Sequence, residues 1–128
     1  MSSLIYLKKL DLGKNHITSL YNFPSLDRLT QLSLENNRID HLPNLGCLRH
    51  LMELYIGNNQ LSRLKDLLNL KSNEKLIILD ITGNPFCSLE ESRGFTIYHL
   101  PRLKVLDGVP IEKQELQEAK LRFAGRLS

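Results

Sequence analysis

The sequence has few cysteines and no long hydrophobic run, and its charges nearly balance. Cys47 and Cys87 stand 40 positions apart with no CxxC spacing, which argues against a disulfide framework and against a zinc knuckle. No stretch approaches the length of a transmembrane helix, and the lysines of the N-terminal MSSLIYLKKL interrupt an apolar pattern, unlike those of a signal peptide. A net charge of +3 is too small to indicate a nucleic acid or a membrane as the partner. We therefore expect a soluble intracellular domain.

Motifs for catalysis and cofactor binding are equally scarce. The seven glycines form neither GxGxxG nor GxxxxGK[ST], so no phosphate-binding loop is indicated. The histidines do not converge in the repeat frame described below, which disfavours a zinc site; they are His16, His41, His50 and His99. We predict a chain that is not an enzyme, with no cofactor, no metal and no small-molecule substrate.

Leucine, by contrast, is abundant and periodic, with 28 copies in 128 residues. Asparagine marks the period: Asn15, Asn37, Asn59 and Asn84 are separated by 22, 22 and 25 residues, and each lies in the same apolar frame. In the second copy the frame consists of Leu29, Leu32, Leu34, Asn37 and Ile39. This pattern, LxxLxLxxNxL, resembles the leucine-rich repeat, and the resemblance covers nearly the whole chain.

Elementary chemistry explains each part of this frame. Apolar and polar residues alternate around Leu10 and Leu12, as in a strand that buries one face. The amide of asparagine both donates and accepts, so a stacked column of asparagines can satisfy the backbone where the chain leaves each strand. Apolar residues then recur three apart, which suits 3₁₀ returns; the segment Arg63–Leu70 of the longer third copy looks more α-helical.

One such copy cannot bury its own apolar face, so the copies must stack. We predict an α/β solenoid: a right-handed leucine-rich-repeat superhelix with a parallel sheet on its concave side and 3₁₀ or helical returns on its convex side. Four repeats occupy residues 1–87, with no N-terminal cap before the first. A C-terminal helical cap occupies residues 88–109, and an amphipathic helix occupies residues 110–128.

The cap segment resembles that of the SDS22-like group of intracellular leucine-rich-repeat proteins, although Ser92 stands where that group has an aromatic. The matching residues are Arg93, Phe95, Ile97, Leu100, Pro101, Leu103, Lys104, Leu106, Asp107 and Gly108. We expect a helix over residues 88–99 that presents Leu89, Phe95 and Tyr98 to the last repeat, and a fifth edge strand over Leu103–Leu106. The final amphipathic helix either shields this edge of the sheet or leaves the domain to bind a partner; we favour shielding.

The resemblance implies a role and a compartment. Members of the SDS22-like group serve as scaffolds or regulatory subunits of a phosphatase, of a spliceosomal partner and of tubulin-related and axonemal assemblies. By resemblance, we expect a non-catalytic protein-interaction module in the cytoplasm, nucleus or cilium.

The outward positions of the strands form the predicted binding surface. Apolar or aromatic side chains lie there beside carboxylates, a composition typical of interaction sites. Because acidic residues outnumber lysines, we expect a partner with a basic contact surface and no nucleic acid. The predicted partner-binding residues are Lys9, Asp11, Gln31, Ser33, Glu35, Glu53, Tyr55, Ile78, Asp80, Thr82, Val105 and Asp107.

Two alternatives remain open at this stage. The chain is either a binding module in itself or the C-terminal segment of a longer repeat array whose partner binds elsewhere. A third hypothesis, an RNA-associated scaffold, rests on the basic residues of the convex side: Arg28, Arg49, His50, Arg63, Lys65, Lys71 and Lys75.

Overall fold

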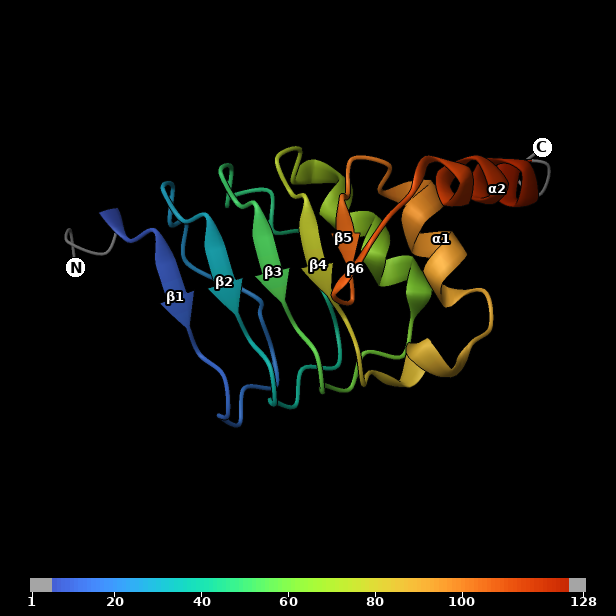
Figure 1. Cartoon of the computed structure of the whole chain (residues 1–128). Coiled ribbons are helices and arrows are strands. Elements are labelled where there is room, and N and C mark those ends of the chain that lie inside the picture. Colours follow the sequence, from blue (N-terminus) through green and yellow to red (C-terminus); the bar gives the residue numbers. More distant parts are fainter. Residues whose placement is uncertain (1–5, 125–128) are drawn as a thin grey trace.

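The computed structural model describes residues 6–124, and its six strands form one sheet in chain order (Figure 1). Strands β1 to β5 pair in parallel, and β6 adds to β5 in the antiparallel direction. The strands are β1 (Lys9–Asp11), β2 (Gln31–Ser33), β3 (Glu53–Tyr55), β4 (Ile78–Asp80), β5 (Val105–Leu106) and β6 (Val109–Pro110). This is the predicted leucine-rich-repeat solenoid with its parallel sheet.

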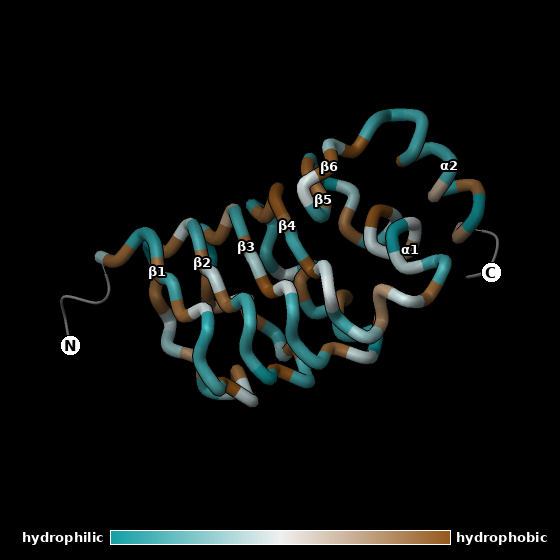
Figure 2. The backbone as a smooth tube through the Cα atoms, turned by 60° about the horizontal axis from the view of Figure 1, so that its bottom comes forward, coloured by the Kyte–Doolittle hydropathy of each residue, from teal (hydrophilic) through white to brown (hydrophobic). Residues whose placement is uncertain are grey.

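The register of the sheet follows the sequence repeat. Leu32 pairs with Leu54, and Leu54 pairs with Leu79, so that equivalent leucines stack from coil to coil. All three side chains are fully buried, because the returns cover the face of the sheet to which they point (Figure 2). Their neighbours along each strand point to the opposite side, which we call the sheet face.

The first coil is the least buried. Leu7, Leu10 and Leu12 are only partly buried, whereas the corresponding Leu29, Leu32 and Leu34 of the second coil are fully buried. The difference follows from position, since a coil at the end of the described stack has a described neighbour on one side only.

The return of the third coil corrects one expectation. Its helix, η2 (Leu64–Ser72), is a 3₁₀ helix and not an α-helix. The reason lies in the spacing of Leu64, Leu67 and Leu70: with three residues per turn, side chains three apart line up on one face. Leu67 and Leu70 are buried in the core, as this geometry requires.

The C-terminal part consists of three helices rather than the two expected. A short 3₁₀ helix, η3 (Pro85–Ser88), precedes α1 (Ser92–His99), and α2 (Lys113–Ala124) packs against α1 (Figure 1). The expectation that Leu89 faces the last repeat is wrong, because Leu89 lies before α1 and is 47% exposed. The outermost strand is β6, so β5 is not the edge strand that we expected.

Candidate interaction surface on the sheet face

Side-chain amides connect successive coils next to the sheet. The Asn37 Nδ2 donates to the carbonyls of Leu12 and Leu34 at 3.0 Å, and its Oδ1 accepts the Ile17 N–H at 3.1 Å. Asn59 makes the same set of bonds one coil later, to the carbonyls of Leu34 and Ile56 and from the Ile39 N–H. Each amide thus fixes the path of its own coil and of the coil before it.

The column changes at its two ends. Asn15 is exposed and donates only within its own coil, to the carbonyls of Leu12 and Gly13. Asn84 is buried and bridges to the third coil through the Ile56 carbonyl and the Leu61 N–H. Beyond it Asp107 Oδ1 accepts the Ile81 N–H at 2.8 Å, so this carboxylate has a structural bond in addition to its predicted place on the sheet face.

Parallel pairing aligns the residues of the sheet face into rows. One row follows Ser33, Tyr55 and Asp80, and the neighbouring row follows Gln31, Glu53, Ile78 and Val105. All of these side chains are partly buried. The structure therefore brings these predicted residues together on three to four adjacent strands.

Tyr55 lies at the centre of a group of carboxylates. Its hydroxyl donates to Glu53 Oε1 at 2.5 Å. That hydrogen bond, burial, and the negative charges of Glu53, Asp80 and Glu35 raise the pKa of Tyr55 to about 12. We call Tyr55, Glu35, Glu53 and Asp80 the acidic cluster; its field favours a cation on the sheet face.

The remaining predicted residues lie around this cluster. Lys9 and Asp11 are exposed on β1, and Thr82 is exposed just after β4. Asp11 Oδ1 accepts the Gly13 N–H at 2.9 Å, and Asp80 Oδ1 accepts the Thr82 N–H at 3.0 Å. These two aspartates therefore shape the turns after their strands while their charges remain on the sheet face.

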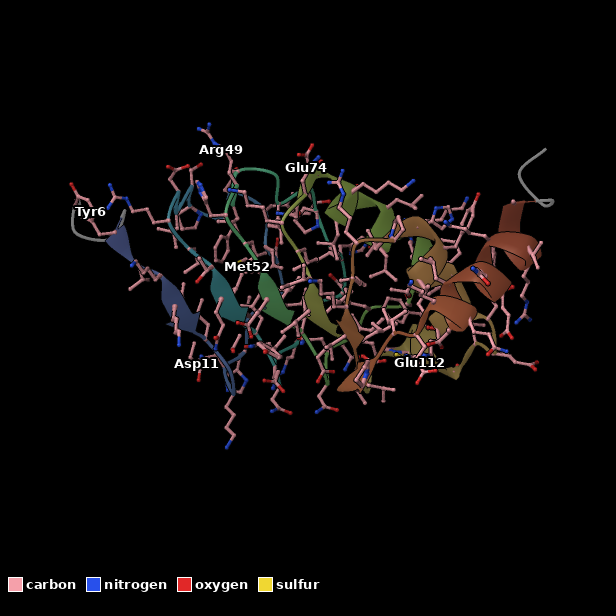
Figure 3. The ribbon with its side chains drawn as sticks, turned by 45° about the horizontal axis from the view of Figure 1, so that its top comes forward. Tyr6, Asp11, Arg49, Met52, Glu74 and Glu112 are labelled. Atoms are coloured by element: carbon pink, nitrogen blue, oxygen red, sulfur yellow. The ribbon has the colours of Figure 1, made fainter. Side chains whose placement is uncertain are left out.

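The margin at which the strands begin has a different character. Figure 3 shows Tyr6, Arg49 and Glu74 along this margin, and Asp11 towards the opposite one. The Arg28 guanidinium lies 4.6 Å from the centre of the Tyr6 ring, and Arg49 pairs with Asp27 at 3.4 Å. Two of the seven basic residues that we expected on the convex side, Arg28 and Arg49, thus already have partners within the chain, an aromatic ring and a carboxylate respectively.

Residues 6–124 contain neither a cluster of metal-binding side chains nor a transmembrane helix. No three histidine, cysteine or acidic side chains of this region gather closely enough to hold a metal ion. No helix among these residues is long and apolar enough to cross a membrane.

Sequence reasoning missed two sets of contacts. On the convex side, Asp66 and Asn69 of η2 bond the backbone of Leu42 in the preceding coil, and Asn73 reaches the Leu45 carbonyl. Between α1 and α2, Arg93 forms a two-pronged ion pair with Glu115. Asn69 and Asn73 could have been recognised in the sequence, because they interrupt a leucine pattern. The ion pair could not have been recognised, because it joins residues 22 positions apart on two helices.

Comparison with known proteins agrees with this geometry. The family described as "Leucine-rich repeat" matches residues 2–128. The chain belongs to the leucine-rich repeat family. Its fold is also similar to U2A′ in the crystal structure of the Drosophila melanogaster SNF/U2A′ complex, with a TM-score of 0.89 and 30% identity over 95% of this chain and 71% of that chain.

More distant leucine-rich-repeat structures resemble the solenoid part. A leucine-rich-repeat protein of Leptospira interrogans gives a TM-score of 0.63 at 29% identity over 77% of this chain. Internalin C2 of Listeria monocytogenes gives 0.62 at 27% identity over 78% of this chain. The chain spans only 25% and 41% of these two proteins, respectively.

Proposed function

We propose that this leucine-rich-repeat chain is a non-catalytic interaction module that binds a basic segment of another protein on its sheet face. The observation behind this proposal is the acidic cluster, in which three carboxylates surround one partly buried tyrosine. A tyrosine within a charged rim supplies contact area and orientation together. The sheet itself is rigid, so little ordering free energy is lost on binding.

The relatives support a protein partner. U2A′ is found in a complex with SNF, and we extend to this chain only the general role of binding another protein. The proposal includes the finer assignments made from the sequence: a scaffold or regulatory-subunit role of the SDS22-like kind, the C-terminal cap, and residence in the cytoplasm, nucleus or cilium.

The test uses a defined probe, a fluorescent amphipathic helical peptide rich in lysine and arginine. Fluorescence anisotropy should show saturable binding by the wild-type chain and no binding of the same peptide with its basic residues changed to glutamate. The double variant Glu35→Lys/Glu53→Lys should weaken binding by at least about tenfold, because like charges then face each other.

The matched control is Glu112→Lys/Glu118→Lys, which makes the same change of net charge on two exposed residues at and near α2. Equal loss of binding in both double variants would show that net charge alone attracts the peptide, and it would contradict a site at the acidic cluster.

The competing proposal is that the chain is a segment of a longer array, with partner binding elsewhere. If that proposal is right, Tyr55→Ala in the full-length protein leaves partner capture unchanged; if the sheet face is the site, capture falls.

A further inference from the structure

A cleft lies between the end of η2 and residues 99–103, away from the acidic cluster. It has a volume of about 330 Å³, and its apolar lining includes Leu70, Leu76, Leu100 and Leu103. Sites for small ligands have volumes of roughly 300–1,000 Å³, so this cleft can hold about one amino-acid residue with its flanking peptide groups. Glu74, another of its lining residues, lies on the margin at which the strands begin (Figure 3).

One lining residue breaks the rule that the rest of the stack follows. Four leucines, Leu29, Leu51, Leu76 and Leu103, each donate a backbone N–H to the carbonyl of the residue three positions earlier, and these acceptors are equivalent residues of successive coils. This column consists of Leu26, Leu48, Asn73 and Leu100. Asn73 is therefore a polar residue, only 4% exposed, in a position otherwise filled by leucine.

The stack uses only one end of this asparagine. Asn73 Nδ2 donates to the carbonyls of Leu45 and Leu48, at 2.9 and 3.3 Å, but both carbonyls already accept a backbone N–H within their own coil. Asn73 Oδ1 is buried and has no hydrogen-bond partner among the described residues. A buried acceptor without a partner is destabilising, so leucine would serve folding better at this position.

The rim of the cleft is positively charged. Lys71 and Arg102 both line it, and Arg102 Nη1 also donates to the Glu74 carbonyl at 3.4 Å. Burial and the nearby Lys71 lower the pKa of His99, which leaves this lining residue uncharged at neutral pH. The lining thus contains two cations and one carboxylate, that of Glu74, and this excess of positive charge favours an anionic group in the ligand.

We propose that this cleft binds the C-terminal residue of a partner polypeptide, with an aliphatic side chain against the leucines. The terminal carboxylate would lie between Lys71 and Arg102. Asn73 Oδ1 is closed to solvent in the free chain, so the terminal peptide N–H would donate to it once the Asn73 side chain turns towards the cleft on binding. The apolar lining matches the side chain of such a residue, the positive rim matches its carboxylate, and the unpartnered acceptor matches its peptide N–H. This site is independent of the acidic cluster and of the proposed function.

The simplest probe with all three parts is N-acetyl-leucine. Titration of the ¹⁵N-labelled chain, followed by NMR, should give saturable shifts of the backbone amides over 70–76 and 99–103. Small ligands gain about 0.3 kcal/mol per non-hydrogen atom, so the dissociation constant should be on the order of millimolar. N-acetyl-leucinamide, which lacks the carboxylate, and N-acetylglycine, which lacks the side chain, should each bind about tenfold more weakly.

Variants separate this site from general attraction of anions. Lys71→Glu/Arg102→Glu should weaken binding of N-acetyl-leucine by at least about tenfold, whereas the matched change Arg63→Glu/Lys65→Glu, on exposed residues at the start of the same return, should leave it unchanged. Asn73→Leu, which keeps the stack intact, should also weaken binding.

Three results would overturn the proposal: shifts that do not saturate, equal shifts with the amide, or equal loss of binding in the two double variants. If folded Asn73→Leu bound N-acetyl-leucine as tightly as the wild type does, Asn73 would not be part of the site, and the proposed hydrogen bond from the terminal peptide N–H would be wrong.

Discussion

Two buried asparagines in this chain have opposite relations to their surroundings. Asn37 bonds the backbone of two coils through both ends of its amide. Asn73 uses only its NH₂ group, and the carbonyls that receive it already have other donors. We therefore expect the same residue type to be required for folding at the first position and to be replaceable by leucine at the second.

Replacement of Asn37 should be costly. Asn37→Ala removes the acceptor of the Ile17 N–H and the donor to three carbonyls, so we expect a loss of about 1–3 kcal/mol in the free energy of unfolding. Urea denaturation measures this loss. The control is Asn15→Ala, at the exposed end of the same column, which should change stability by no more than about 0.5 kcal/mol. Equal losses would contradict the inter-coil role of Asn37.

Asn73 should behave differently. Asn73→Leu replaces a buried polar side chain by the residue that fills the equivalent positions 26, 48 and 100. We expect the free energy of unfolding to stay the same or to rise by up to about 1 kcal/mol, since an unpaired acceptor is removed. A loss of stability in urea denaturation comparable to that of Asn37→Ala would show that Asn73 serves the fold.

Tyr55 should make stability depend on pH in the alkaline range. Its pKa is raised from 10.0 to about 12, first by the hydrogen bond to Glu53. The folded state therefore keeps the proton that the unfolded state loses, and this contribution to stability is complete below pH 10 and disappears as the pH rises towards 12.

NMR of chain labelled at the tyrosine Cζ, assigned with Tyr55→Phe, measures this pKa. In Glu53→Gln the pKa of Tyr55 should move back towards 10.0, because the main cause of the shift is removed. An unchanged pKa in that variant would contradict the geometry of the acidic cluster.

At the scale of elements, the C-terminal helix α2 depends on one polar contact and one close approach. Arg93 of α1 donates to both Glu115 oxygens, and its Nη1 donates to the Leu106 carbonyl at 3.1 Å. Phe123 packs against Phe95 edge to face, with ring centres 6.2 Å apart. A Cβ on Gly94 would come within 2.9 Å of Phe123 Cε2, so the helices can approach closely only because residue 94 is glycine.

Gly94→Ala should therefore loosen α2 without unfolding the repeats. Hydrogen–deuterium exchange should accelerate over 113–124 and stay unchanged over 51–61, because the clash lies only between α1 and α2. The control is Ala124→Gly at the exposed end of α2. Uniform acceleration of exchange along the chain would show that α1 and α2 unfold together with the repeats.

Much of the element order was predictable, and the failures have physical causes. The strands were predictable because each one alternates a leucine with polar residues in a frame set by asparagine. The 3₁₀ return was missed because RLKDLLNL has the composition of an α-helix; the three-residue spacing of Leu64, Leu67 and Leu70 was the better guide. The break before α1 and the contact of α2 with α1 depend on packing between distant segments, which periodicity does not encode.

The same holds for the candidate sites. The rows of the sheet face follow from the repeat, so the positions around Tyr55 could be grouped from the sequence. Two hydrogen bonds could not be predicted from the sequence. One joins Tyr55 to Glu53, two residues apart on one strand, and the other joins the Ile81 N–H to Asp107. The cleft beside Asn73 is formed by segments from two coils and became visible only in three dimensions.

At the scale of the whole molecule, the stack separates two surfaces of opposite charge. The acidic cluster lies on the sheet face of the middle strands, whereas the cleft with Lys71 and Arg102 lies between the end of η2 and residues 99–103. A rigid solenoid holds both surfaces in fixed relation. The chain can thus engage a basic segment and a chain terminus at separate places, and loss of one site leaves the other intact.

If the sheet face around Tyr55 receives the partner, a photoreactive side chain placed there will cross-link to it. Benzoylphenylalanine is placed at Tyr55 in one preparation and at Tyr21, which is 67% exposed on the first return, in another. With the basic helical peptide at saturation, we expect a strong cross-link from position 55 and none above background from position 21. Equal cross-linking from both positions, or cross-linking from position 21 alone, would contradict it.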